Sequence, residues 1–482
     1  MILLGINNQE EIPEEEQHTF VTSATIIIFL QIGFSLFEIS FVQKKNWTNI
    51  LMKNMVDFQF CVLGFWMLGF GFSTGKGNAF CGTENFIGMD MVAAKFGPWF
   101  YELVFPTTSS TLISGAWIGR VKLNFYAFFS LVYGSWIYPI LAHWEFSTNG
   151  WLSRLNTGST RVTIGVHDTA GAGSVHLLSS AIALIGTVVL GPRVGKFPTT
   201  NTTTTTAAGT NAVYREHRSA LYLILGFLFI LIAWIPFNAG SNETIRNNQN
   251  YSAVPYSTVL TIAGSTVSGI IISFIKHRDY IYHPEIIIMS SLSGAITSSA
   301  SAAYVIKGWA SFIIGFVSSF PSYYCGILLK KLKIDDPVGV SPMHGVSSIW
   351  GLIATGLFAS KTSITPHNGL FFGGGFGILK SNLLLIIVTI GWGIVNGFIF
   401  IWCLNKIWNI SVPYDEQIAG LDATEHNCKI EGFIVSENDQ NFEESSWDTN
   451  NSENNDSEKN RSEINGSEIN DSEINSSENN YL

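Results

Sequence analysis

The sequence is poor in charge. Only 13% of its 482 residues are charged, whereas 47% are hydrophobic. Most of the charged residues lie near the two ends or in short segments between apolar stretches. A soluble protein distributes charge over its whole surface, so this composition argues against a soluble globular fold.

Cysteine is also scarce. The cysteines show neither the paired spacing of a metal site nor a dense disulfide framework. We therefore predict no intrachain disulfide, no metal ion and no cofactor. The five positions are Cys61, Cys81, Cys325, Cys403 and Cys428.

Apolar stretches of membrane-spanning length dominate residues 18–408. Each has about twenty residues, the length that a helix needs to cross the hydrocarbon core, and short polar segments separate them. This pattern predicts an all-α polytopic membrane protein with eleven transmembrane helices. The predicted spans are residues 19–43, 53–73, 91–119, 122–143, 169–191, 218–239, 254–276, 283–305, 308–330, 336–360 and 380–407.

Lysine and arginine are concentrated in the segments that follow odd-numbered spans. The segments that follow even-numbered spans carry acids and asparagine instead. The positive-inside rule then places the N-terminal segment, residues 1–17, outside the cell and the C-terminus in the cytosol, which requires an odd number of spans. The basic residues are Lys44, Lys45 and Lys53; Arg120 and Lys122; Arg193, Lys196, Arg215 and Arg218; Lys276 and Arg278; and Lys330, Lys331 and Lys333.

One segment occurs twice. Residues 174–187 read SVHLLSSAIALIGT, and residues 342–355 read PMHGVSSIWGLIAT. Their histidines, His176 and His344, fall in the fifth and the tenth predicted spans. Because five is odd, the second copy enters the membrane in the opposite orientation, which predicts two inverted five-helix repeats. The repeats cover about residues 18–192 and 215–360, and the last helix, 380–407, follows them.

The remaining segments are polar. Residues 199–206 and the acidic tail, 436–482, are of low complexity, and we expect both to be disordered. The tail is either a solvated appendage or a docking segment for a cytosolic regulator. Residues 409–435 form a separate cytosolic segment before the tail.

A histidine inside a membrane span is costly and indicates function by default. The alternative is a satisfied hydrogen-bonding group between helices. Two neutral imidazoles in contact, His176 and His344, can accept, donate and relay protons, which suits a small hydrogen-bonding substrate. Asp168, eight residues before His176, is expected to cap the start of a helix or to place negative charge where a cation arrives.

The histidine segments resemble the signature motifs of the ammonium transporter (Amt/Mep/Rh) family. Residues 167–176 read HDTAGAGSVH, and residues 335–345 read DDPVGVSPMHG. The resemblance extends over residues 18 to 430 and points to the eukaryotic Amt branch. Other segments also resemble the family: residues 29–38, which are followed by 49–54, residues 234–241, and residues 420–426.

The resemblance implies a substrate pore in which His176 and His344 are the twin histidines and Trp234 is a lining residue. It implies that Phe105 and Phe237 are stacked rings that gate the outer end of this pore.

Outside the gate, the resemblance implies a recruitment site formed by Phe146, Ser241, Phe105 and Asp168. The family has tryptophan where this chain has Phe146, and tryptophan is the best ring for cation–π binding. We therefore expect weaker binding of the cation at this position.

The implied function is transport of ammonium or ammonia, and of methylammonium. Moving a bare ion into an apolar path has a large desolvation free energy, so the cation is expected to lose a proton at the outer mouth. Two alternatives remain: an ammonium sensor that signals through its tail with little flux, and a neutral-gas channel. We expect no enzymatic activity.

The resemblance also implies a homotrimer in contact with membrane lipid, without a nucleic-acid partner. We expect the plasma membrane, with a vacuolar or endolysosomal membrane as the alternative. Gly420 and Thr424 lie in the family's cytosolic coupling segment, where a phosphorylation switch and a constitutive docking segment are the two interpretations. Asn242 and Asn250 begin glycosylation sequons in a loop predicted to lie outside.

Overall fold

The computed structural model describes residues 12–89, 91–197, 219–241, 251–362 and 364–428. The chain divides into two compact units, Met1–Ile430 and Glu431–Leu482. The second unit lies outside the described residues, as do the predicted low-complexity loop and the sequons at Asn242 and Asn250.

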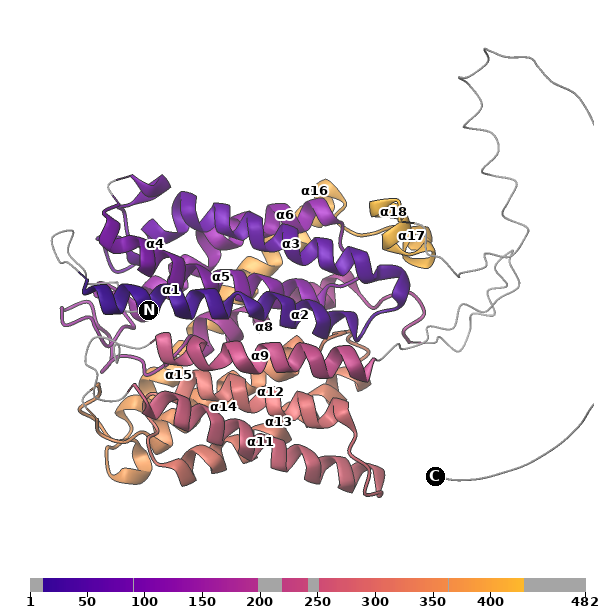
Figure 1. Ribbon diagram of the computed structural model, residues 1–482. Coiled ribbons are helices and arrows are strands. Elements are labelled where there is room, and N and C mark those ends of the chain that lie inside the picture. Colours follow the sequence, from indigo (N-terminus) through magenta and orange to yellow (C-terminus); the bar gives the residue numbers. More distant parts are fainter. Residues whose placement is uncertain (1–11, 90, 198–218, 242–250, 363, 429–482) are drawn as a thin grey trace, which may run out of the picture. The chain divides into compact units, whose positions relative to one another are not determined.

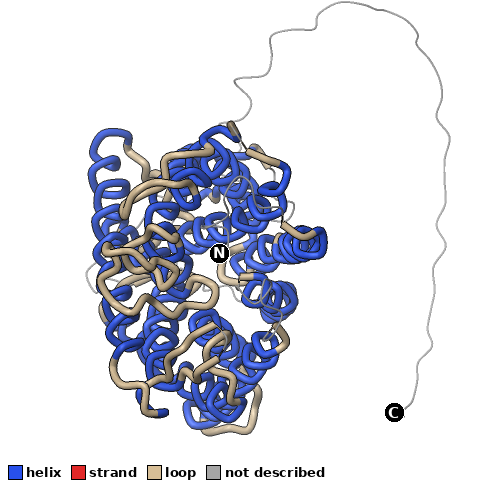
Figure 2. Tube along the Cα trace, turned by 90° about the vertical axis from the view of Figure 1, so that its left-hand side faces the viewer, coloured by secondary structure: helices blue, strands red, loops and turns tan. Residues whose placement is uncertain are grey.

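The described residues fold into helices joined by loops, and their only β-structure is two isolated bridges (Figures 1 and 2). Each of the eleven predicted spans holds at least one helix within the described residues. The helices are α1 (Glu14–Ile27), α2 (Phe29–Ile39), α3 (Trp47–Gly64), α4 (Phe70–Thr74), α5 (Phe96–Ala116), α6 (Leu123–Val132), α7 (Tyr138–Phe146), α8 (Leu178–Leu190), α9 (Ala220–Gly240), α11 (Ala253–His277), α12 (Pro284–Ser301), α13 (Gly308–Lys331), α14 (Ser347–Phe358), α15 (Gly377–Gly397), α16 (Leu404–Trp408), α17 (Tyr414–Ala419) and α18 (Leu421–His426).

Several predicted boundaries differ from the structure, two of them near the N-terminus. The first helix begins at Glu14, so the predicted N-terminal segment, residues 1–17, overlaps it. The second predicted span begins at residue 53, but α3 begins at Trp47. A carboxylate from a distant part of the chain stabilises the polar first turn of α3. Local hydropathy cannot predict such a contact.

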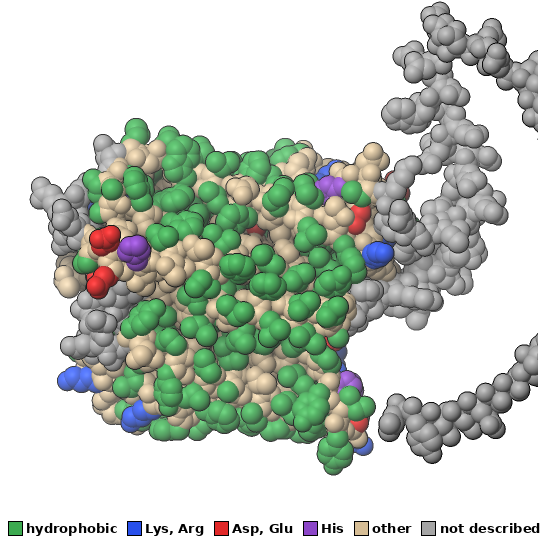
Figure 3. Space-filling view, viewed as in Figure 1, with side chains coloured by type: hydrophobic (Ala, Val, Ile, Leu, Met, Phe, Trp, Pro, Cys, Tyr) green, Lys and Arg blue, Asp and Glu red, His purple; other side chains and the backbone are tan. Residues whose placement is uncertain are grey.

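Eight helical stretches in the described residues are long and apolar enough to cross a membrane. Three predicted spans lie outside this set. Their helices, α5, α12 and α14 with its preceding turn, are rich in serine and threonine that are largely buried inside the protein. Hydrophobic side chains cover the helical walls, and charged side chains gather at the helix ends (Figure 3). The chain is therefore an all-helical, polytopic integral membrane protein.

The first helices of the two predicted repeats cross at a pair of glycines. A Cβ added to Gly33 would lie 3.0 Å from the carbonyl oxygen of Gly226, and a Cβ added to Gly226 would lie 2.7 Å from that of Gly33. Larger residues would force α2 and α9 apart, because small residues permit the closest approach of membrane helices.

A buried ion pair joins α2 to α3. Lys53 Nζ lies 2.8 Å from Glu38 Oε2, and the two side chains are 1% and 4% exposed. Lys53 also donates to Ser114 Oγ of α5 at 2.8 Å, and Asn54 donates to Glu38 at 3.0 Å. These bonds compensate the cost of burying both charges between three helices.

A second ion pair connects the end of α8 to the loop that follows α13. Arg193 donates from Nε to Asp335 Oδ2 at 2.8 Å and from its guanidinium Nη2 to Oδ1 at 2.9 Å, a bidentate contact. Burial raises the pKa of Asp335, but the hydrogen bonds and positive charge of Arg193 outweigh it and lower the pKa to about 2.

This ion pair predicts a specific loss of stability in acid. The folded pKa of Asp335 lies below its unfolded value of about 3.9, so the pair contributes about 2 kcal/mol above pH 4, and this is lost as the pH falls through 2. The unfolding temperature of the full chain in detergent should therefore exceed that of Asp335→Asn at pH 6, and the difference should shrink towards pH 2. The exposed Asp415→Asn is the matched control. A difference that stays constant from pH 6 to pH 2 would contradict the assignment.

Candidate functional site

The two histidines of the repeated segment meet in the interior. His176 lies in a π-helical turn, Ala172–Leu177, that leads into α8, and His344 lies in a second one, Ser341–Val346, that leads into α14. Their Nδ1 atoms are 3.3 Å apart, and their side chains are buried. π-Turns interrupt the regular helical bonding and occur often at functional sites.

An aspartate holds the start of the first turn. Asp168 accepts hydrogen bonds from the backbone N–H groups of Gly171 and Ala172 at 2.9 Å and of Gly173 at 2.7 Å. The chain enters the turn through Gly171, whose φ of 82° favours glycine. Asp168 therefore satisfies helix-start amides in a buried place where water does not reach them.

The second turn repeats this arrangement. Asp336 accepts from Gly339 and Val340 at 3.0 Å and from Ser341 at 2.7 Å, and the φ of Gly339 is 75°. The spacing Asp-x2-Gly-x4-His is the same in both copies. Sequence analysis selected Asp168 but missed Asp336, although alignment of the two copies at their histidines would have found it.

Aromatic rings from α9 and α5 lead to the histidines. The ring of Trp234 stacks on His176 at 5.3 Å and 9°, and Phe237 lies 5.9 Å from the same imidazole. Phe105 packs against Phe237 with a centroid distance of 4.8 Å and an interplanar angle of 51°. These rings and His176 form one continuous line of contacts.

Tyr101 and Ser241 extend this line. The ring of Tyr101 lies 5.3 Å from Phe105, and its hydroxyl is 3.2 Å from Ser241 Oγ. Ser241 also donates to the carbonyl of Phe237 at 2.6 Å. Sequence analysis missed Tyr101, whose position four residues before Phe105 puts both rings on one face of α5.

Phe146 lies apart from this line. It is the last residue of α7 and is 9% exposed. Among the described residues it makes no ring contact with Phe105 or Phe237. Its helix packs against the turn that carries His176.

Glu145, next to Phe146, is a buried acid that sequence analysis missed. Its carboxyl group interacts with Asp168 and Ser174. A Cβ on Gly173 would lie 3.2 Å from Glu145 Oε1, so the Glu145 and Asp168 carboxyl groups meet beside this glycine. The predicted span ended at residue 143, which wrongly left Glu145 outside it.

Several polar atoms around the histidines lack protein partners. His176 Nε2 is buried and has no hydrogen-bond partner among the described residues. The hydroxyls of Ser347 and Ser348 are likewise buried and have no partner there. Buried polar atoms in proteins are nearly always paired, so unpaired ones indicate a binding site for a small polar molecule.

A cavity of about 470 Å³ lies next to the second turn. Pro342 and Met343, which precede His344, line one part of it, and Lys276, His283 and Lys330 line another. The cavity therefore extends from the histidine segment towards the end where α11 and α12 are joined.

The C-terminal helix α18, which follows α17, caps two other helices. Asp422 accepts from the backbone N–H groups of Thr48 and Asn49 at 3.0 and 2.7 Å, in the first turn of α3. Glu425 accepts from the N–H of Leu123, which begins α6, at 3.3 Å. This explains why α3 starts before the apolar stretch begins.

Gly420 and Thr424 lie in this capping segment. The φ of Gly420 is 107°, and a Cβ there would meet the Lys45 side chain at 2.8 Å. Thr424 is exposed, and its hydroxyl donates to the carbonyl of Gly420 at 3.2 Å.

The apolar helices and the buried histidine pair define an integral membrane protein of the transporter class. The match to the Ammonium Transporter Family covers residues 18–430. The chain belongs to this family, which confirms the prediction from its sequence. Its members are transporters and not enzymes, and family membership assigns ammonium transport to the chain.

Relatives from distant organisms match over most of their length. Ammonium transporter 1 member 3 of Solanum lycopersicum is 30% identical over 425 residues, which is 84% of this chain and 90% of that protein. Ammonium transporter 3 of Dictyostelium discoideum is 30% identical over 417 residues, covering 84% and 91%. Ammonium transporter Amt2 of Archaeoglobus fulgidus is 32% identical over 418 residues, covering 83% and 85%.

Solved structures share the fold. A sensor Amt protein superposes with a TM-score of 0.74 at 26% identity and covers 85% of this chain and 98% of its own. Mep2 of Candida albicans gives a TM-score of 0.71 at 22% identity, covers 85% and 89%, and supports the fold alone.

The surroundings of Glu145 predict that its negative charge contributes nothing to stability. Glu145→Gln keeps the shape of the side chain and can donate a hydrogen bond to Asp168, so we expect it to be within about 0.5 kcal/mol of wild type or more stable. Glu38→Gln is the matched control: it leaves Lys53 buried without its charged partner and should cost about 3 kcal/mol or more. Thermal unfolding in detergent measures both. Equal destabilisation by the two variants would contradict this prediction.

Proposed function

We propose that the chain carries ammonium or ammonia, and methylammonium, along a path lined by His176, His344 and Trp234. The observation that carries this proposal is the buried Nε2 of His176, which has no hydrogen-bond partner among the described residues. The Nδ1 of the same ring lies 3.3 Å from Nδ1 of His344. A neutral molecule that donates and accepts hydrogen bonds satisfies such atoms.

The outer part of the path begins at Ser241 and Phe146. The hydroxyl oxygen of Ser241 can replace part of the water shell of ammonium, and Phe146 offers a ring face to the cation. Asp168 supplies negative charge behind this entrance. The closely packed rings of Phe105 and Phe237 close the path and must move for a molecule to pass.

Selectivity follows from the cost of moving a charge into the apolar path. A bare cation loses its hydration there without an equivalent replacement, whereas the desolvation free energy of neutral ammonia is far smaller. Deprotonation at the entrance therefore excludes potassium ions, which have no proton to lose. The released proton can follow separately along the contacting imidazoles, which gives net charge movement.

The wider organisation is part of the same proposal. It comprises eleven spans in two inverted repeats, an outer N-terminus and a cytosolic coupling segment at residues 409–435. The paired aspartate motifs and the glycine crossing of α2 and α9 support the two repeats. A homotrimer in the plasma membrane, in contact with lipid, is the proposed assembly. Thr424 is the proposed regulatory site, because it is an exposed residue of the helix that caps α3 and α6.

Ammonium sensing is the second candidate function. The similarity to a sensor Amt protein favours it, together with a C-terminal segment bonded directly to the ends of two membrane helices. A sensor of this kind would bind ammonium at the same path but conduct little.

Uptake of methylammonium with simultaneous current recording tests the function. In cells that lack their own transporters, the wild type should give saturable uptake with current, and His176→Ala should change or abolish both because it removes half of the imidazole pair. His367→Ala, an exposed histidine in the loop after α14, should behave as wild type.

Two results would redirect the proposal. Uptake without current would favour the neutral-gas channel. A surface-expressed wild type with neither uptake nor current would contradict transport and favour the sensor.

The ring at position 146 predicts a gain of affinity. Phe146→Trp should lower the KM for methylammonium about five-fold, because the larger indole strengthens cation–π attraction by about 1 kcal/mol. Phe376→Trp, an exposed position 58% accessible, controls for a tryptophan added elsewhere. An unchanged KM in Phe146→Trp would remove Phe146 from the recruitment site.

A further inference from the structure

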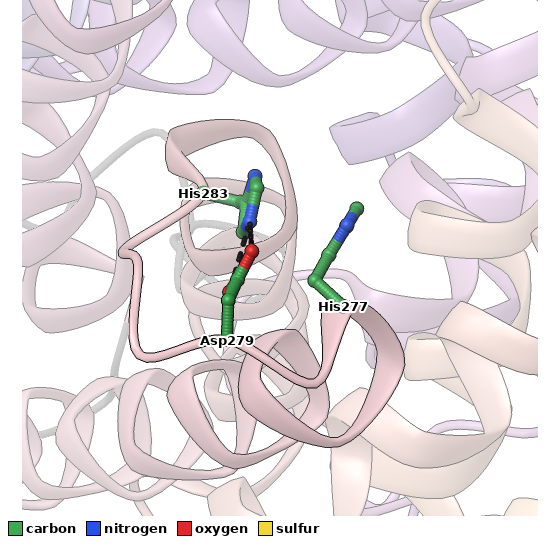
Figure 4. A group of neighbouring side chains, drawn as sticks. All are labelled: His277, Asp279 and His283. Atoms are coloured by element: carbon green, nitrogen blue, oxygen red, sulfur yellow. Dashed lines mark hydrogen bonds and ion pairs between the residues drawn. The ribbon is translucent and has the colours of Figure 1, made fainter.

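Three potential metal ligands lie together in the turn between α11 and α12, away from the histidine pair (Figure 4). His277 is the last residue of α11, and His283 immediately precedes Pro284, the first residue of α12. Asp279 lies between them in the sequence. One ligand atom from each of the three residues lies within 4.8 Å of the other two.

The side chains already contact one another. The imidazole rings of His277 and His283 stack with centroids 3.7 Å apart and an interplanar angle of 21°. His283 Nε2 lies 3.3 Å from Asp279 Oδ2, a contact drawn as a dashed line in Figure 4.

The turn brings the three residues together by reversing the chain over a short distance. Arg278 adopts φ 55° directly after His277, which ends α11 and turns the backbone towards Asp279. The N–H of Ile281 donates to Asp279 Oδ1 at 3.2 Å and orients the carboxylate. The ligand set is therefore held by the helix hairpin and is not scattered along a flexible segment.

We propose that His277, Asp279 and His283 bind a divalent transition-metal cation of the zinc type. Two imidazole nitrogens and one carboxylate oxygen suit zinc, cobalt or nickel, whereas magnesium and calcium prefer oxygen ligands alone. Three protein ligands leave the fourth tetrahedral position to water.

Metal binding requires the ligand atoms to move closer together and the two imidazole rings to turn. Metal bonds of about 2.0–2.2 Å place tetrahedral ligand atoms about 3.3–3.6 Å apart, closer than the present limit of 4.8 Å. The donor lone pair of an imidazole lies in the ring plane, so the stacked rings of His277 and His283 must rotate before both nitrogens face one ion. The side chains of His283 and Asp279 are 31% and 34% exposed, which leaves them room to rotate and gives the ion a path from solvent. Sequence analysis predicted no metal because it considered only cysteine spacing and the two buried histidines.

The proposed metal site lies beside a cavity through which it can affect transport. His277 and His283 line the cavity that reaches Pro342 and Met343 beside His344, and Lys276 and Lys330 line it as well. A bound dication would add positive charge to a cavity whose lining holds three lysines and three acids: Lys196, Lys276 and Lys330, and Glu285, Asp335 and Asp336. This consequence rests on the proposed function: a cation or proton leaving through the cavity would be repelled, so the loaded protein should transport more slowly.

Calorimetric titration tests the site independently of transport. The full chain is purified in detergent without an affinity tag, treated with a chelator and titrated with zinc chloride. We expect one ion per chain, with binding weakened about ten-fold or more in His277→Ala, Asp279→Asn and His283→Ala. The matched control is His18→Ala, an exposed histidine outside the turn, whose Nε2 lies 3.7 Å from Glu14 Oε1.

Cobalt provides a second readout. A tetrahedral site with these ligands should give visible cobalt absorption in the wild type that disappears in Asp279→Asn. Equal zinc affinity in the wild type and the three variants, or no zinc binding to the wild type, would overturn the proposal.

The effect on transport is measured separately. Zinc should lower methylammonium uptake by the wild type about two-fold or more while leaving Asp279→Asn unaffected. Equal uptake with and without zinc would overturn the effect on transport. If the wild type does not transport at all, calorimetry alone still decides whether the metal site exists.

Discussion

The structure depends on satisfying backbone N–H groups where helices begin inside the protein. At membrane depth an unpaired amide costs several kcal/mol because no water is available. Asp168 and Asp336 meet this requirement by accepting three amides each, at the start of the two π-turns. The position of each histidine, eight residues later, follows from the aspartate that anchors its turn. Two aspartates thus set the geometry of the whole site.

The sequence predicted the fold class and the histidine pair because both leave local signals. Apolar stretches of fixed length indicate spans, and two copies of one segment single out His176 and His344. The start of α3 at Trp47 could not be found in this way, since its first amides are bonded by Asp422, far along the chain. Glu145 was missed for a related reason: a helix end was placed three residues too early.

Serine and threonine explain another limit of hydropathy. The helices α5 and α12 carry many hydroxyls, yet almost all of these are buried, and several donate to carbonyls one turn earlier, as Thr108 does to Val104 at 2.6 Å. The hydroxyls of such side chains find their hydrogen-bond acceptors within the same helix, and their small size allows close packing. Helices at the centre of a membrane protein can therefore be more polar than those that face lipid.

The capping of α3 and α6 by the C-terminal segment limits where the chain can be shortened or extended. A chain cut after α16 would lose the carboxylates of Asp422 and Glu425, and the first turns of α3 and α6 would keep amides with no acceptor from that segment. Fluorescent tags, purification handles and shortened versions for crystallisation therefore belong beyond residue 428. Joined at residue 408, they would remove part of the membrane domain's own support.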